Sequence, residues 1–150
     1  MSDEWTKGHL AIVIPGEPCA QGRPRFARRG AHMVAYDPTK SRNWKATAQA
    51  HMRAAMAGAQ PMQGPVGCEL QATFTCPAGD WRKRSPRLRR WHAKRPDGEN
   101  VAKAVLDAAT GVLWLDDAQV ARLDVWKLIG AQGEAPGVRL LVWQLGEGQP

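Results

Sequence analysis

The segment from Val66 to Cys76 alternates strictly between apolar and polar side chains, which constrains the fold more than any other feature of this sequence. Val66 and Leu70 belong to the apolar set, and Glu69 and Gln71 belong to the polar set. Successive side chains of an extended chain point to opposite faces, so a period of two predicts a half-buried β-strand. The chain must therefore contain a β-sheet.

Periodicity elsewhere predicts further strands and two main helices. Strands are expected at 9–16, 112–115, 119–129 and 138–145, and helices at 39–58 and about 99–109. The first helix has an apolar stripe formed by Trp44, Ala48, Met52, Ala55 and Met56. Residues 17–34 are expected to form a loop or a distorted hairpin, and residues 80–95 a basic loop. Helices segregated from runs of strands predict an α+β fold with a mixed sheet.

A chain of 150 residues has the size of one domain, so we expect a single domain over 1–150, with 1–8 and 146–150 flexible. The first eight residues are polar and lack the apolar stretch of a secretory signal, and nothing approaches the length of a membrane span. We therefore expect a cytoplasmic protein without a membrane partner. Cys19, Cys68 and Cys76 match no zinc spacing and are odd in number, which favours reduced thiols.

The formal charge is +7, and most of the basic side chains fall into two groups. The first group contains Arg23, Arg25, Arg28, Arg29, Lys40, Arg42, Lys45 and Arg53, and the second contains Arg82, Lys83, Arg84, Arg87, Arg89, Arg90, Lys94 and Arg95. Arginine dominates both, which suits bidentate contact with phosphate, so a nucleic-acid backbone is the expected partner. A solubilising surface or a flexible basic loop is the structural alternative.

In contrast to these basic groups, residues 95–120 contain several acidic side chains. The apolar pattern of the same stretch predicts a helix and a strand. Asp97 precedes the helix and could cap its N-terminus, while Glu99, Lys103 and Asp107 recur every four residues along one edge. Asp116 and Asp117 follow the expected strand 112–115. Structural alternatives remain open for all of them: an N-cap, a solvated row of ion pairs, and an ordinary turn.

Convergence of Asp97, Glu99 and Asp117 would instead supply the hard oxygen ligands that Mg²⁺ prefers. Lys103, one helical turn after Glu99, could approach the same phosphate and offset the added negative charge. Carboxylates surrounded by arginines form the arrangement that a phosphodiesterase requires. The basic rim attracts DNA, and a metal ion offsets the repulsion between the carboxylates and the phosphates.

The segment from Pro96 to Val120 also resembles the signature of the RusA family of Holliday junction resolvases. The resemblance lies in P-D-x-[DE]-N-x-x-K-x-x-x-D-A followed by D-D-A-Q-V, and the earlier PGEPCAQGRPRF and AYDPTKSRNWK are similar to the entry region of many members. The resemblance covers roughly residues 10–145, although only residues 96–120 carry a motif that is specific to the family. One departure is Glu99, where the family usually has Asp, which moves the carboxylate one methylene further out.

The resemblance implies a RusA-like homodimer that binds four-way DNA junctions and nicks two strands symmetrically in recombination and repair, with Mg²⁺ or Mn²⁺. It also implies that Asp97, Glu99 and Asp117 bind the metal and that Lys103 is catalytic, whereas Asp107 and Asp116 match acidic positions of less certain, supporting role. The symmetry has a physical basis, since a four-way junction offers two equivalent strands to a two-fold dimer.

Two other functions remain open from sequence. One is a nuclease that cuts other branched DNA such as forks or flaps, because phosphate contacts do not select a branched structure. The other is a non-catalytic DNA- or RNA-binding protein, in which the carboxylates only cap and pair. The acidic group argues against the second, since a pure phosphate binder gains nothing from carboxylates beside its arginines.

Overall fold

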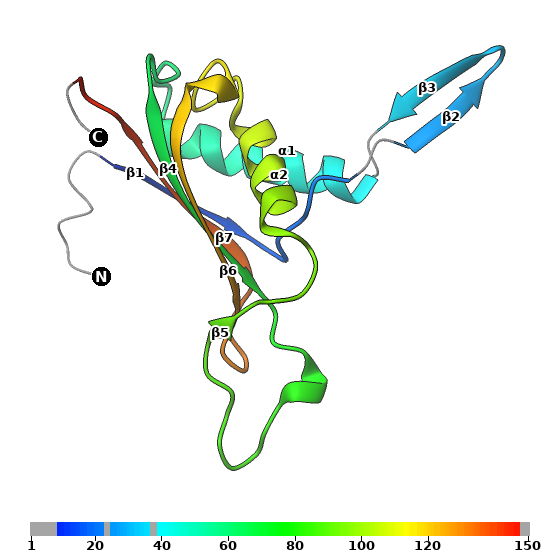
Figure 1. Cartoon of the computed structure of the whole chain (residues 1–150), viewed down its shortest axis with the longest axis vertical. Coiled ribbons are helices and arrows are strands. Elements are labelled where there is room, and N and C mark those ends of the chain that lie inside the picture. Colours follow the sequence, from blue (N-terminus) through cyan, green and yellow to red (C-terminus); the bar gives the residue numbers. More distant parts are fainter. Residues whose placement is uncertain (1–8, 23–24, 37–38, 148–150) are drawn as a thin grey trace.

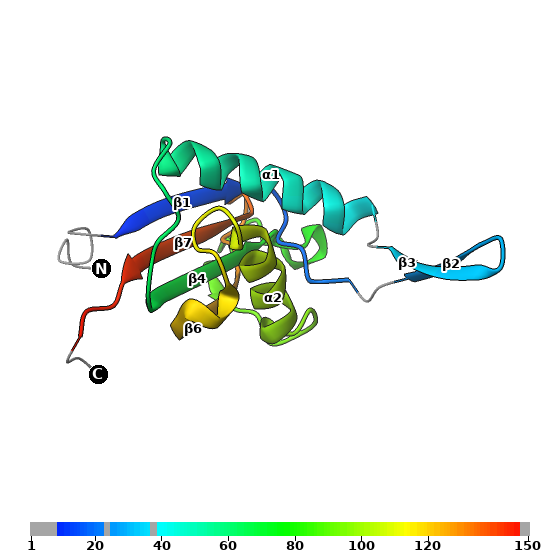
Figure 2. The same ribbon diagram turned by 90° about the horizontal axis from the view of Figure 1, so that it is seen from above.

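The computed structural model describes residues 9–22, 25–36 and 39–147, in which two helices cover one face of a five-stranded mixed sheet (Figures 1 and 2). In spatial order the strands are β1 (Leu10–Pro15), β7 (Gly137–Gln144), β4 (Val66–Phe74), β6 (Val120–Ile129) and β5 (Arg90–Trp91). The helices are α1 (Thr39–Met56) and α2 (Gly98–Ala109). The predicted α+β class with a mixed sheet is confirmed.

The alternating strand β4 lies at the centre of the sheet, antiparallel to β7 and parallel to β6. A parallel pair requires a crossover connection, and α2 lies within it. The chain leaves β4, passes through a 3-10 turn η2 (Ala78–Asp80), a basic loop and the edge strand β5, and then enters α2. Because α2 carries the chain back toward the start of β6, the residues just before β6 lie at the C-terminal end of the helix.

The core lies between the sheet and the helices, as the apolar stripes predict. Ala48 and Met52 of α1 and Val101 and Val105 of α2 are fully buried against Leu70 and its neighbours in β4. The three cysteines are free and buried, and burial together with nearby Glu69 and Asp124 raises the pKa of Cys68 to about 12. That thiol therefore stays neutral at physiological pH.

The predicted strand at 112–115 is wrong. These residues form a turn after α2, with Leu113 N donating to Ala109 O and Gly111 adopting a positive φ of 85°. Leu113 and Trp114 are nevertheless fully buried. A short buried apolar run satisfies either a strand or a tight turn against the core, so burial alone does not specify extended backbone.

Two further predictions are refined by the structure. The polar face of β4 is partly covered, because Trp143 lies over Gly67, where an added Cβ would come within 2.3 Å of the indole ring. The segment predicted as a loop or distorted hairpin at 17–34 forms a hairpin that extends to Tyr36. It pairs β2 (Arg25–Arg29) with β3 (His32–Tyr36) in a separate two-stranded sheet that projects from the main body (Figure 1). No helix among the described residues has the length and apolar character needed to cross a membrane.

Candidate active site

The N-terminal end of α2 presents an exposed carboxylate at the mouth of a hollow. Asp97 occupies the N-cap position, yet its side chain makes no capping hydrogen bond. The hollow has a volume of about 630 Å³ and is lined by Arg95, Pro96, Asp97 and Asn100. The capping role considered from the sequence is therefore not used, and the Asp97 carboxylate remains available to a ligand.

Glu99 and Lys103 lie on the exposed edge of the same helix. The Lys103 Nζ is 3.1 Å from the Glu99 Oε1, and their side chains are 59% and 78% exposed, respectively. At this exposure the ion pair contributes little to stability. The pair is thus easily exchanged for contacts to a phosphate or a cation.

A lysine from the neighbouring strand fixes the backbone that leads to Asp97. Lys127 in β6 extends its Nζ to Lys94 O at 2.7 Å and to Pro96 O at 2.5 Å, donating to both. The last two residues before Asp97 are joined by a cis peptide bond between Arg95 and Pro96. The backbone segment that leads to the acidic end of α2 is therefore held by the ammonium group of Lys127.

The Asp116–Asp117 pair lies in a short turn, η3 (Asp117–Gln119), where the two acids have different surroundings. Asp116 accepts a hydrogen bond from Ala118 N at 2.9 Å and caps this turn. Within the described part of the chain, the Asp117 side chain has no hydrogen bond or ion pair. Of the two side chains, that of Asp117 is the one with both carboxylate oxygens unused among the described residues.

Gln119 holds this turn from both sides through four hydrogen bonds. Its Oε1 accepts from Leu115 N and Asp116 N at 2.9 and 3.0 Å, and its Nε2 donates to Met62 O and Gly64 O at 2.9 Å each. The acidic turn is thereby attached both to its own backbone and to the loop before β4.

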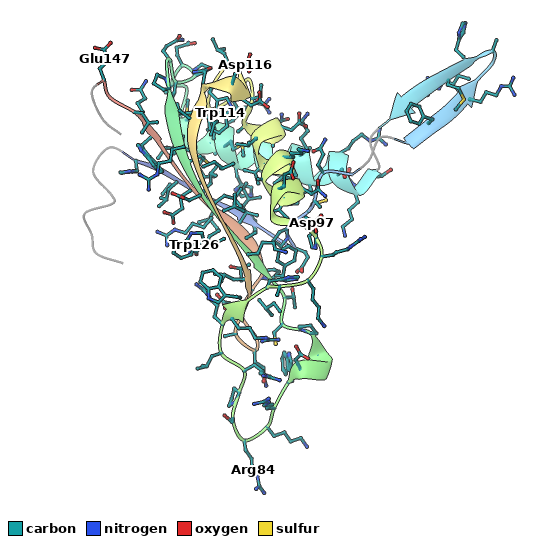
Figure 3. The ribbon with its side chains drawn as sticks, viewed as in Figure 1. Arg84, Asp97, Trp114, Asp116, Trp126 and Glu147 are labelled. Atoms are coloured by element: carbon teal, nitrogen blue, oxygen red, sulfur yellow. The ribbon has the colours of Figure 1, made fainter. Side chains whose placement is uncertain are left out.

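The structure does not bring the three predicted metal ligands together within one chain. Asp97 and Glu99 lie at the beginning of α2, whereas Asp116 and Asp117 lie beyond its end (Figure 3). The helix has 12 residues, which makes it roughly 18 Å long at 1.5 Å per residue. Among the described residues no group of three His, Cys, Asp or Glu side chains could hold a metal ion. The three predicted ligands therefore do not form one metal site within the described part of a single chain.

Asp107, the third acid on the α2 edge, connects the two helices. Its Oδ2 lies 2.9 Å from the Nζ of Lys45 in α1. This contact agrees with a supporting role and separates Asp107 from the free carboxylates.

The second basic group lies on the loop that runs from β4 to Asp97. Arg82, Lys83, Arg84, Lys94 and Arg95 are exposed, with Arg84 at the far tip of the loop (Figure 3). The loop is attached at its base, because Gln132 Oε1 accepts from Arg82 N at 2.9 Å and Arg87 N at 3.3 Å. Two other arginines form ion pairs, Arg89 with Glu134 and Arg90 with Asp80.

The first basic group is described only in part. Arg28 and Arg29 are exposed on the projecting hairpin. Arg25 belongs to β2, but its side chain lies outside the described residues, as does the whole of Arg23. The DNA-binding roles assigned to both basic groups remain predictions.

Comparison with known proteins agrees with these features. The sequence profile described as "Endodeoxyribonuclease RusA" matches residues 15–141, which include both ends of α2 and the basic loop. The chain belongs to the RusA family. It is also 28% identical over 142 residues to "Uncharacterized protein YqaN" of Bacillus subtilis (strain 168), an alignment covering 89% of this chain and 94% of that protein.

Two residues that support the site of this RusA family member escaped the sequence analysis. Gln119 could have been found, since an acid at Asp116 followed three residues later by Gln is a capping-box pattern. Lys127 gives no local signal, because its contacts depend on the pairing of β6 with the edge strand and on the path of the chain after it.

Proposed function

We propose that this protein is a homodimeric, metal-dependent endodeoxyribonuclease that resolves four-way DNA junctions by paired, symmetric nicks. Membership of an endodeoxyribonuclease family supports the reaction class. The single observation that carries the site assignment is that Asp97 and Asp117 present carboxylates without a hydrogen bond or ion pair in the described part of the chain. Arg95 lines the same hollow as Asp97 but forms no ion pair with it among the described residues, so the acid is not used to neutralise its basic neighbour.

The basic groups support DNA as the substrate. Exposed Arg82, Lys83 and Arg84 carry no ion pair among the described residues, so they are available to phosphate oxygens. Contacts of this kind place a protein on DNA and make binding strongly dependent on salt. Lys94 and Arg95 continue this surface to the hollow at Asp97.

The separation of the acids supports a dimeric site. When a two-fold axis places two α2 helices side by side and antiparallel, the start of one helix lies beside the end of the other. Asp97 and Glu99 of one chain would then meet Asp117 of the partner subunit. The edge of α2 that carries Glu99, Lys103 and Asp107 is exposed and available for such an approach.

Mg²⁺, with Mn²⁺ as a substitute, is part of this proposal, and its three carboxylate ligands would come from two chains. A divalent ion between such acids would activate water and stabilise charge on the phosphate. Asp97, Glu99 and Asp117 are the proposed ligands. Lys103 would bind the phosphate once Glu99 turns from it toward the ion.

Mixing two inactive variants tests the proposal. Asp97→Asn and Asp117→Asn should each lower cleavage of a labelled four-way junction by at least about 100-fold, because each removes a charged ligand. In a 1:1 mixture of exchanged subunits, each heterodimer would regain one intact site, so about a quarter of the native sites should return. The returning activity should be single nicks, with linear duplex and a three-way fork as comparison substrates.

The reciprocal mixture is the matched control. Native protein mixed with the double variant Asp97→Asn/Asp117→Asn gives heterodimers with one substitution in every shared site, so these heterodimers should be inactive. If each site instead belonged to one chain, the first mixture would stay inactive and these heterodimers would keep one active site. Native protein that cleaves no branched DNA with either metal would contradict the proposed reaction itself.

A further inference from the structure

A second hollow lies on the face of the sheet that the helices leave uncovered. Its volume is about 320 Å³, and we name it the tryptophan pocket, lined by Gln71, Arg89, Arg90, Trp91, Trp126 and Leu128. Trp126 lies on the side of the sheet away from α1 and α2 (Figure 3). This pocket is therefore separate from the hollow at Asp97.

The strand register places the two indole rings together. Trp91 of β5 pairs with Leu128 of β6, and Trp126 precedes Leu128 by two residues on the same face. The ring centroids of Trp91 and Trp126 are 5.8 Å apart at an angle of 62°, an edge arrangement that leaves ring surface open. Trp91 is 69% exposed and Trp126 is 37% exposed. Such exposure of two large aromatic residues indicates a ligand.

The charges of the pocket favour an uncharged planar ligand. Both arginines in its wall form ion pairs, Arg89 with Glu134 and Arg90 with Asp80. The hydrogen bond from Arg89 lowers the pKa of the Glu134 carboxyl and raises the pKa of the guanidinium, so this pair stays ionised and internally neutralised. The pocket thus lacks the excess positive charge that a phosphate requires, while ring faces and the Gln71 amide suit a heterocycle.

The surrounding basic residues indicate where such a heterocycle comes from. Arg82, Lys83 and Arg84 of the adjoining loop are free to bind a nucleic-acid backbone. Trp91 is six residues from Asp97, a separation of at most roughly 20 Å. A DNA strand carries one phosphate per 3.4 Å, so the pocket lies within about six nucleotides of the acidic end of α2.

We propose that the tryptophan pocket binds an unstacked nucleobase of the branched DNA substrate. The inference rests on the proposed function, since a branch point is where bases lose their stacking partners. Stacking on aromatic rings tolerates any base, so the pocket distinguishes branched from continuous DNA without reading sequence. Arg89 and Arg90, held by their acids, form rigid walls that orient the base.

The surroundings of the pocket favour a base over a second protein chain. Across the strands, Trp126 lies opposite Gln71, and Gln71 lies opposite Arg139. The row ends at Val13, which is 64% exposed, so Gln71 and Arg139 separate its apolar side chains. A stable dimer instead buries about 800 Å² on each partner around a continuous apolar centre.

The test uses a four-way junction with the fluorescent base 2-aminopurine at the branch, in chelator so that no strand is cut. Trp91→Leu and Trp126→Leu should weaken junction binding by roughly 5- to 100-fold, the contribution of one stacked base. Binding of the native protein should quench the fluorescence, and both variants should reduce this quenching. Affinity for a continuous duplex should change little.

Trp81→Leu is the matched control, because Trp81 is 53% exposed in the same loop but does not line the pocket. It should leave junction binding and quenching unchanged. Trp126→Phe keeps a ring and should retain most of the affinity, which guards against misfolding of the leucine variant. Circular dichroism and the thermal midpoint establish that each variant is folded.

Three results would overturn the inference. Unchanged junction binding and quenching in both leucine variants would exclude a base subsite. An equal loss of affinity for continuous duplex would show that the tryptophans contact any DNA, branched or not. A shift from dimer to monomer in light scattering would identify a self-association surface instead. Native protein that binds the junction no better than duplex would contradict the proposed function, which separates that failure from failure of the pocket alone.

Discussion

The two ends of α2 carry acids of the same motif but hold them differently. At the C-terminal end, Asp116 caps the turn and Gln119 makes four hydrogen bonds, two within the turn and two to the loop before β4. At the N-terminal end, support comes from another strand, because Lys127 of β6 donates to two carbonyls before Asp97. One end is held by a neutral side chain of the turn itself, and the other by a cation from a strand of the sheet.

The acids at these two ends differ in whether they make structural hydrogen bonds or stay available to a ligand. Of the adjacent pair, Asp116 is used in the turn, which leaves Asp117 free. At the other end Asp97 stands at an N-cap position without a capping hydrogen bond, and Lys127 holds the backbone before it. In both places a carboxylate without a hydrogen bond lies next to backbone that another side chain holds.

The largest expected effect comes from substituting the adjacent acids separately. Asp117→Asn should lower the single-turnover rate of junction cleavage by at least about 100-fold, because it removes a proposed metal ligand. Asp116→Asn keeps an oxygen that can accept from Ala118 N, so its rate should stay close to that of the native protein. Equal losses in the two variants would contradict the division of roles.

A smaller effect is expected from Lys127→Met, which keeps much of the side-chain stem but removes the donors to Lys94 O and Pro96 O. Cleavage should fall by about 10- to 100-fold, as for other groups that orient a ligand. The metal concentration for half-maximal cleavage should rise, while junction binding in chelator should stay unchanged. Lys127→Arg should restore part of the rate, because a guanidinium can also donate to both carbonyls.

Arg122→Met on the same strand is the control for Lys127, since Arg122 forms an exposed ion pair with Asp124. It should leave cleavage and metal dependence unaltered. A Lys127→Met protein with native metal dependence and a merely lower thermal midpoint would show that Lys127 stabilises the fold without positioning Asp97.

The elements that sequence predicts well are those with a sustained period. β4, α1 and α2 each repeat an apolar pattern over many residues, and all three form close to the expected bounds. The turn at 112–115 was mistaken for a strand because four apolar residues, three of them buried, are too few to show a period. The two-residue strand β5 escaped prediction within the basic run, since edge pairing of this length leaves no pattern.

The site residues Asp97, Glu99, Lys103 and Asp117 stay a prediction, and the structure adds their arrangement. The motif that carries them did not indicate that α2 would keep Asp97 and Asp117 apart. The predicted helix could have indicated this separation, because a helix that lies between two acids holds them apart by its own length. Tertiary contacts such as those of Lys127 could not be anticipated, since they arise only when β6 pairs within the sheet.

The smallest effect is expected from Asp107, which lies between the two ends of α2 and pairs with Lys45 of α1. Asp107→Asn should leave the cleavage rate unchanged and lower the free energy of unfolding by at most about 1 kcal/mol, because the two side chains are 46% and 38% exposed. Urea unfolding at low and high salt measures this, and the difference from native protein should shrink as salt screens the pair. A large loss of cleavage would instead place Asp107 with the free carboxylates, and the division between structural and chemical acids along α2 would no longer hold.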